Sequence, residues 1–410
     1  MREIEKIGRL VVQKLFDAGY TAYFAGGWVR DFIRGEPSDE IDIATSAPPD
    51  KVCALFPKTI PVGVAFGVII VVEEGEHFEV TTFRKDHPYL DGRHPTGVDF
   101  STPEKDAHRR DFTINGMFYD PLTETIYDFV GGQDDLQKGI IRAIGDPHAR
   151  FVEDRLRMVR AIRFSARFGF SIEKKTEQAI HSLAHTLFPA VSIERIWQEL
   201  TKMSKSPRFA EALLLMHETR LLATIFPEFE TISLEELQKR VCFFPYFPID
   251  CPTLLFLLEL FPDYTLEQKE SLCFFLKLSK ADRHLMEFWE KASTLTSTSS
   301  LTAWAHLYAH PHADLFIEVQ TVKQLPPQRE LFAEEHAARR KKLSHHIKRI
   351  ECRHPLLSAG QLRKAGILPG KKMGLLLREA ERLTIENNLT HASEVLHLLK
   401  SSELWNLPDV

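Results

Sequence analysis

The sequence predicts an α+β N-terminal domain, built from a small mixed sheet with helices, followed by a region that is entirely helical. Two observations support this prediction. Short β-branched segments bounded by glycines, such as 62–72 and 77–84, occur up to about residue 132 and are typical of strands. After Asp134, amphipathic segments alternate with Pro, Gly and Ser breaks, a pattern typical of helices. We expect four parts: 1–135, 136–205, 206–330 and 331–410.

Composition narrows the class of protein. A chain of 410 residues has room for two to four domains. No apolar run reaches the roughly 18–20 residues that span a bilayer, and the first residues lack the apolar core of a signal peptide. Five scattered cysteines include no Cys-x-x-Cys pair, so we expect a reduced, cytoplasmic protein without a zinc or disulfide framework. The net charge of −5 does not exclude nucleic acid, because local charge decides that.

The first candidate site follows a predicted helix over 4–18 and a predicted strand over 21–25. The strand ends at Gly26 and Gly27, where the next helix begins. Unpaired N–H groups and the helix dipole favour an anion there. Arg30 lies about one turn into that helix, placed to reach a phosphate.

An acidic segment comes next. Glu40 and Asp42 alternate with isoleucines, so on a strand both carboxylates share one face. Paired carboxylates need a counter-charge, and hard oxygen ligands suit Mg2+. Two such ions can activate an attacking hydroxyl and neutralise a triphosphate leaving group. Glu79 is a possible third carboxylate. The alternatives are a solvated acidic turn and, for Glu79, an edge-strand acid paired to a basic neighbour.

The glycine pair and the acids together resemble the signature of the nucleotidyltransferase superfamily of DNA polymerase beta. The more detailed match is to its class II branch, the tRNA CCA-adding enzymes and bacterial poly(A) polymerases. This resemblance implies a nucleotidyltransferase head followed by a helical neck, body and tail. The chain departs from the family pattern at Glu40, where the family usually has Asp, and Asp39 precedes it. Glu40 keeps the side-chain face, so we expect Glu40 and Asp42 to be the metal ligands.

A second motif runs over 109–115. On a helix, Asp111 and Asn115 share a face and can bond sugar hydroxyls, while Arg110 can bond a phosphate. These residues match the ribose-recognition motif Arg-Arg-Asp-x-x-x-Asn of the family. The polar segment 85–95 reads as a loop and resembles the flexible loop that helps the family switch from C to A addition.

A third motif lies in a predicted helix over 151–164, where Asp154, Arg157, Arg160 and Arg163 step by three along one face. Arginine only donates hydrogen bonds and an ionised aspartate only accepts them, so together they complement the base edge of cytosine or adenine. A basic amphipathic helix with an ion pair is the alternative. Asp154 and Arg157 match the family motif for protein-templated base selection, and Arg160 and Arg163 match further nucleotide contacts. The segment 192–199 resembles a motif that braces this helix.

The C-terminal segment is basic. Between Glu334 and Arg382, thirteen Lys and Arg against five Glu give a local charge of +8, which is typical of phosphate binding. The segment 362–374 places Gly and Pro between helices and resembles the element of CCA-adding enzymes that grips the outer part of tRNA. We expect Lys364, Lys371 and Lys372 to contact RNA.

The resemblance implies template-independent addition of C, C and A to tRNA 3′ ends from CTP and ATP, with release of pyrophosphate and with Mg2+ as cofactor. The loop residues 91–95 favour full CCA addition. The alternatives are a poly(A) polymerase, an A-adding or CC-adding enzyme, and a non-catalytic RNA-binding protein. We expect no membrane association and no obligate protein partner.

Overall fold

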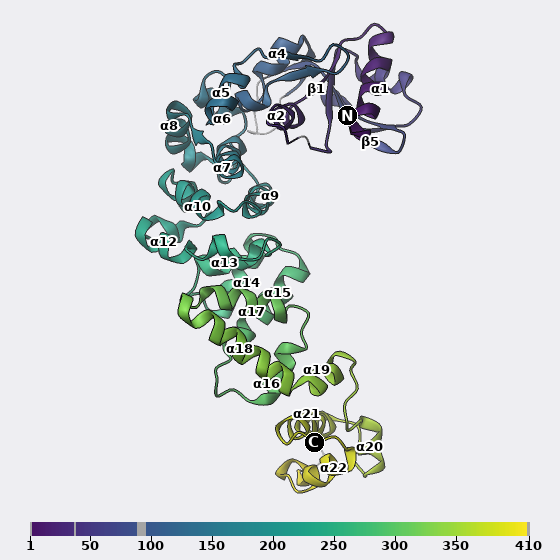
Figure 1. Cartoon of the computed structure of the whole chain (residues 1–410), viewed down its shortest axis with the longest axis vertical. Helices are drawn as coiled ribbons and strands as arrows, with labels where there is room; N and C mark the ends of the chain where they lie inside the picture. The colour runs from purple at the N-terminus through teal and green to yellow at the C-terminus, as the bar shows by residue number, and fades with distance from the viewer. Residues whose placement is uncertain (1, 37, 88–95, 408–410) are drawn as a thin grey trace. The chain divides into compact units, whose positions relative to one another are not determined.

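The computed structural model describes residues 2–36, 38–87 and 96–407. The chain divides into two compact units, Met1–Pro245 and Tyr246–Val410 (Figure 1). Within the described ranges, no helix combines the length and apolar character needed to cross a bilayer. The boundary between the units does not test the finer division into four parts, which stays a prediction.

The N-terminal unit contains a mixed sheet, as predicted. The sheet has seven strands in the order β3-β4-β5-β2-β1-β8-β9. Strands β2 and β5 run parallel, while every other neighbouring pair in this sheet is antiparallel. The predicted strand over 62–72 separates into β3, a 3-10 turn (Val64–Phe66) and β4. The bounds of the sheet strands are β1 Ala22–Ala25, β2 Asp42–Thr45, β3 Thr59–Gly63, β4 Val68–Glu73, β5 Glu76–Thr82, β8 Phe118–Asp120 and β9 Thr125–Tyr127. Two smaller pairs are β6 (Arg84–Asp86) with β7 (Val98–Phe100), and β10 (Ile140–Ile141) with β11 (Ser171–Ile172).

Helix α1 (Glu3–Asp17) packs on this sheet (Figure 1). Its buried face carries Ile7, Val11 and Leu15, which is the helical spacing that the sequence predicted. Gly8 lets the helix approach closely, because a Cβ there would lie 3.0 Å from the ring of Phe24. This helix therefore supports β1, the strand that leads into the glycine pair.

The rest of the N-terminal unit is mostly helical. Its helices are α2 Gly27–Ile33, α3 Pro49–Leu55, α4 Pro103–His108, α5 Gly132–Lys138, α6 Pro147–Glu153, α7 Leu156–Phe168, α8 Lys174–Leu183, α9 Ile193–Ser204, α10 Phe209–Glu218, α11 Leu221–Ile225 and α12 Leu234–Val241. Helix α7 packs against α9 and α10, and its buried residues include Met158, Val159 and Ile162. The arginines of α7 are thereby held on a fixed helix.

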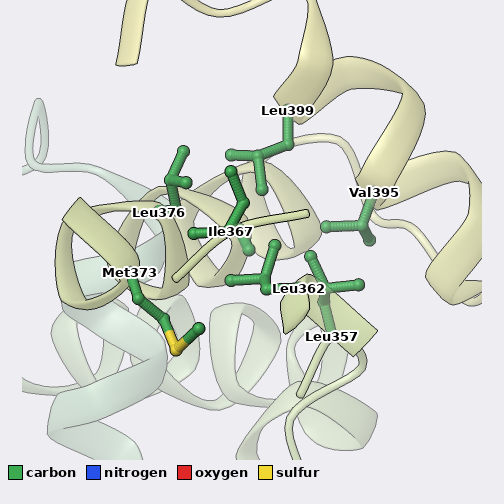
Figure 2. Close-up of a cluster of buried hydrophobic side chains, with 8 residues drawn as sticks. Leu357, Leu362, Ile367, Met373, Leu376, Val395 and Leu399 are labelled. Carbon is green, nitrogen blue, oxygen red and sulfur yellow. The ribbon is translucent and has the colours of Figure 1, made fainter. Parts of the chain in front are cut away.

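The C-terminal unit is entirely helical in its described part, as predicted. Its helices are α13 Thr253–Leu260, α14 Leu266–Phe275, α15 Lys280–Ser293, α16 Leu301–Tyr308, α17 Ala313–Lys323, α18 Pro326–Lys342, α19 Ser344–Glu351, α20 Ala359–Lys364, α21 Lys371–Glu386 and α22 Ala392–Lys400. Helices α20 to α22 share a small core in which Leu362, Leu376 and Leu399 are fully buried. Figure 2 shows these side chains pointing toward one another from three helices.

Candidate active site

A pocket of about 580 Å³ opens in the N-terminal unit. Among the described residues, eight arginines and five carboxylates line it, so its walls carry excess positive charge. All the predicted nucleotide-binding residues and both predicted metal ligands line this one pocket. The lining residues are Gly26, Gly27, Trp28, Arg30, Asp31, Ser38, Glu40, Asp42, Arg109, Arg110, Asp111, Asn115, Asp154, Leu156, Arg157, Arg160, Arg163, Phe164, Arg167 and Arg195.

Gly26 lies where an acid and a base approach each other. It follows Ala25, which pairs with Asp42 across β1 and β2, and its φ of +67° is one that favours glycine. A Cβ on Gly26 would lie 3.3 Å from Nη1 of Arg110 and 3.7 Å from Oδ2 of Asp42. Because glycine has no Cβ, the space next to Asp42 and Arg110 stays open, and both side chains line the pocket there.

Two neighbouring strands bring acids side by side. Asp42 and Glu79 are register partners on the parallel strands β2 and β5, and both side chains are exposed. Register partners on adjacent strands lie on the same face of a sheet. Because β5 lies inside the sheet, the interpretation of Glu79 as an edge-strand acid was wrong.

The charge on Asp42 is poorly compensated. Its pKa is raised to about 6, first because the surrounding protein displaces water and then because Glu79 and Glu40 are negatively charged, while Arg110 opposes the shift. Hard carboxylate oxygens with uncompensated charge are suitable ligands for Mg2+. Within the described ranges, no three His, Cys, Asp or Glu side chains are grouped closely enough to form a metal site. The two carboxylates nevertheless supply the oxygen donors that a divalent cation takes, and Glu40 and Asp42 as its ligands stay a prediction.

The two candidates for the first acid point in different directions. Glu40 lines the pocket, although it lies just before β2 rather than on it. Asp39 is 86 % exposed and accepts a 2.7 Å ion pair from Nη1 of Arg2. The geometry therefore favours Glu40 as the partner of Asp42.

The helix predicted over 109–115 was wrong. Helix α4 ends at His108, Phe112 forms a bridge with Ala143, and only a 3-10 turn covers Thr113–Asn115. Asp111 and Asn115 nevertheless lie side by side, as predicted, because Nδ2 of Asn115 donates a hydrogen bond to Oδ1 of Asp111 at 3.1 Å.

Asp106 organises the two arginines of this motif. It is 1 % exposed and accepts hydrogen bonds from Nε of Arg109 at 2.8 Å and from Nε and Nη2 of Arg110 at 3.1 and 3.0 Å. Although burial alone would raise the pKa of Asp106, these two arginines hold it below its usual range. Nη1 of Arg110 makes no hydrogen bond within the described part of the chain, and it faces Gly26. The spacing of Asp106 and Arg110, four residues apart, could have revealed this support.

The single helix predicted over 151–164 was also wrong, because the chain breaks at Asp154. This residue is extended and lies between α6 and α7, so it does not share a helix face with Arg157. Its carboxylate accepts hydrogen bonds from the backbone N–H of Leu156 at 3.1 Å and from Nη2 of Arg195 at 3.1 Å. Arg157 donates to Glu153 at 2.8 Å. Asp154 and Arg157 still line one pocket, each oriented by its own partner.

The segment expected to brace the base-selecting helix does contact it. Glu199 of α9 accepts a 2.5 Å hydrogen bond from Nε of Arg163 and lies 3.9 Å from Nη1 of Arg160. Arg160 also donates to Oδ2 of Asp111 at 2.5 Å. Although burial alone would raise the pKa of Asp111, Arg160 and Asn115 hold it well below its usual range. Arg160 and Arg163, which are predicted to contact the nucleotide, are thus held in place by carboxylates.

Arg30 has more partners than its predicted phosphate role requires. It is 3 % exposed, forms two 2.8 Å hydrogen bonds to Asp31, and donates to Oδ1 of Asn115 at 2.6 Å. Asp31 was missed by sequence reasoning, although its position directly after Arg30 was a usable signal. The phosphate role of Arg30 stays a prediction.

The predicted RNA-binding lysines lie in the C-terminal unit. Lys364 ends α20, Lys371 begins α21, and both are exposed, whereas Lys372 is half-buried. The turn between them carries Leu368, which is 66 % exposed. The predicted loop at 85–95 lies partly in a strand, since β6 covers Arg84–Asp86, and residues 88–95 lie outside the described residues.

Two segments of the N-terminal unit match known protein families. Residues 22–142 match the family described as Poly A polymerase head domain, and residues 169–232 match "Probable RNA and SrmB- binding site of polymerase A". A CCA-adding enzyme of Geobacillus thermodenitrificans is 48 % identical over 212 residues, 52 % of each chain. One of Lactobacillus helveticus is 41 % identical over 255 residues, 62 % of this chain and 63 % of that relative. The chain thus spans about half the length of the first of these curated relatives.

Solved structures extend the similarity to nearly the full length. The crystal structure of Bacillus stearothermophilus CCA-adding enzyme in complex with CTP has a TM-score of 0.74 at 28 % identity and covers 98 % of this chain and 99 % of that chain. Thermotoga maritima CCA-adding enzyme complexed with tRNA-CCA shares the fold, with a TM-score of 0.68 at 20 % identity over 97 % and 94 % of the two chains.

The mixed sheet, the glycine turn beside Asp42, and the arginine-lined pocket are the features expected of a nucleotidyltransferase head, the domain type that residues 22–142 match. The matched motifs and the shared fold then specify the branch. The chain is thus similar to the class II nucleotidyltransferases, the CCA-adding enzymes and bacterial poly(A) polymerases, in sequence over about half of its length and in fold over nearly all of it.

Proposed function

We propose that this protein adds C, C and A to the 3′ end of tRNA from CTP and ATP and releases pyrophosphate. One observation carries the proposal: a single pocket collects Glu40 and Asp42, Arg110, the Asp111–Asn115 pair, and Asp154 with Arg157. These groups suit a metal, a phosphate, a sugar and a base edge in turn. Relatives named CCA-adding enzyme support the particular product.

In this proposal each group performs one task. Gly26, Gly27, Arg30 and Arg110 hold the triphosphate, and Nη1 of Arg110 provides a donor on the same side of Gly26 as Asp42. Asp154 and Arg157 read the Watson–Crick edge of cytosine or adenine, with Arg160 and Arg163 holding the rest of the nucleotide. Positioning and electrostatic stabilisation then account for most of the catalysis.

Glu40 and Asp42 would hold Mg2+, and Glu79, the register partner of Asp42 on β5, would be a third carboxylate beside the pair that adds negative charge. When bound, Mg2+ would supply the charge that lowers the pKa of the RNA 3′ hydroxyl and steadies the triphosphate. The loss of water around Asp42 and the neighbouring carboxylates Glu79 and Glu40, which together raise its pKa, support this assignment. The cytoplasmic location expected from cysteine usage also stays a prediction.

The test is extension of a tRNA transcript that ends at its discriminator base, with Mg2+ and CTP alone, ATP alone, or both. We expect two additions with CTP and a third only when ATP is present. Long tails from ATP on any RNA would instead establish a poly(A) polymerase. One addition to tRNA already ending in CC would establish an A-adding enzyme, and CTP additions with no A would establish a CC-adding one. No incorporation would leave a non-catalytic RNA-binding protein.

A further inference from the structure

Five side chains form a continuous series of hydrogen bonds along the pocket wall. Both carboxylate oxygens of Asp31 accept from Arg30 at 2.8 Å, and Nη1 of Arg30 donates to Oδ1 of Asn115 at 2.6 Å. Nδ2 of Asn115 donates to Oδ1 of Asp111 at 3.1 Å, and Arg160 donates to Oδ2 of Asp111 at 2.5 Å. The series therefore runs from acid to base to amide to acid to base.

The chemistry of its members fixes which way the amide of Asn115 points. A guanidinium can only donate, so the atom facing Arg30 must be the carbonyl oxygen. An ionised carboxylate can only accept, so the atom facing Asp111 must be the amide nitrogen. Both requirements agree, and the reversed amide would lose both bonds. Asn115 therefore offers an N–H donor, beside a carboxylate acceptor, to whatever occupies the pocket.

We propose that Asp31, acting through Arg30, is a positioning residue that locks this amide and thereby makes the pocket select ribose over 2′-deoxyribose. This inference rests on the proposed function, in which Asp111 and Asn115 bind the sugar. A 2′-hydroxyl accepts from the amide N–H and donates to the carboxylate. A 2′-deoxy sugar can make neither of these hydrogen bonds, so it binds more weakly by the free energy that the two bonds contribute.

The surroundings of the Asp31–Arg30 pair explain why it can hold the amide of Asn115 in one orientation. Asp31 is 5 % and Arg30 3 % exposed, and the ring of Phe168 lies 4.6 Å from the guanidinium carbon. Arg167 donates to the same carboxylate at 3.3 Å. If the charge of Asp31 is removed, Asp111 is the acid that still attracts the guanidinium of Arg30. Arg30 then turns away from Oδ1 of Asn115, and the amide is free to reverse.

The test compares the dissociation constants of CTP and 2′-deoxy-CTP, measured by competition with a fluorescent nucleotide. We expect Asp31→Asn to reduce the preference for CTP by about tenfold to a hundredfold, mainly through weaker CTP binding. Glu290→Gln is the matched control, because Glu290 also pairs with a buried cation, Lys269, at 2.8 Å but lies in the C-terminal unit. It should leave the preference unchanged.

Asp31→Asn leaves the buried Arg30 without its neighbouring carboxylate charge and could therefore prevent folding. A second variant avoids this problem. Replacing both residues, Arg30→Met with Asp31→Leu, leaves neither member of this pair as an unpaired buried charge and is expected to fold, yet it also frees the amide of Asn115 to reverse. A preserved ratio in either folded variant would overturn the proposal. So would equal weakening of both nucleotides by Asp31→Asn, which indicates a merely structural role, or a wild-type protein that binds both alike. Because binding needs no turnover, failed incorporation would reject the proposed function without deciding this inference.

Discussion

Asp42 carries an unusual electrostatic cost in the metal-free protein. Its folded-state pKa of about 6 exceeds that of an unfolded aspartate, about 3.9. A carboxyl whose pKa is raised by folding contributes stability at low pH and loses it as pH rises through 6. The ionised Asp42 is therefore a stability cost at pH 7, and a bound cation would relieve it.

We predict that Asp42→Asn lowers nucleotide incorporation by on the order of 100-fold or more, yet raises the melting temperature in EDTA at pH 7. The gain should be small, about 1 kcal/mol or less, because the side chain is exposed and water screens it. Thermal melts at pH 7 and pH 4 check this, and the gain should shrink at the lower pH. An equal gain at both pH values would contradict the assigned pKa.

The identity of the first acid is decided by a matched pair of variants. We predict that Glu40→Ala loses incorporation and raises the Mg2+ concentration needed for half-maximal activity. Asp39→Ala should stay within about twofold of wild type, because an exposed ion pair such as that with Arg2 contributes about 0–1 kcal/mol. A Mg2+ titration of both variants makes the comparison. A larger loss from Asp39→Ala would show that the ligand order is reversed.

At the scale of elements, the turn between β1 and α2 combines backbone strain with a close approach. We predict that Gly26→Ala destabilises the protein by about 1–3 kcal/mol and also abolishes activity, because its Cβ enters the space between Asp42 and Arg110. Gly35→Ala is the control, since Gly35 has a φ of +78° but nothing within 4 Å of its Cβ position. Melting temperatures and incorporation rates separate the two effects. If Gly35→Ala loses activity equally, backbone strain alone accounts for both.

The periodicity of apolar residues predicted helices and strands well where those apolar residues form the buried face of the element. Helix α1 and the alternating exposure from Glu40 to Ile43 followed directly from the spacing of apolar residues. The interrupted helices depended on distant partners instead. Asp154 is held by Arg195, and Phe112 pairs with Ala143. Tertiary contacts of this kind override local helix propensity and leave no local signal.

The site shows the same division. The residue types needed to recognise metal, phosphate, sugar and base could be read from the order of the motifs. Their support could not, since Arg160 reaches Asp111 across 49 positions of sequence. Asp111 and Asn115 were predicted to be neighbours because they would share a face of a helix. They are neighbours, but the segment that carries them is not an α-helix.

At the scale of the whole molecule, the C-terminal lysines provide a test of RNA binding separate from catalysis. We predict that Lys364→Ala with Lys371→Ala weakens tRNA binding and reduces the slope of log affinity against log salt by about 1.4–1.8. Lys280→Ala with Lys291→Ala is the control, since both lysines are exposed in the same unit. Binding measured at several salt concentrations decides the question. An unchanged slope would place the RNA contact elsewhere.

The surplus of arginine in the pocket has a consequence for the direction of the reaction. Walls that attract a triphosphate also attract the pyrophosphate that leaves it, because the charge of the arginines does not depend on which polyanion is present. Accumulated pyrophosphate should therefore compete with CTP for the same walls. Given a finished 3′ end in the site, it should also drive the reverse reaction and shorten the RNA. Net synthesis would then depend on removal of pyrophosphate from the surrounding solution.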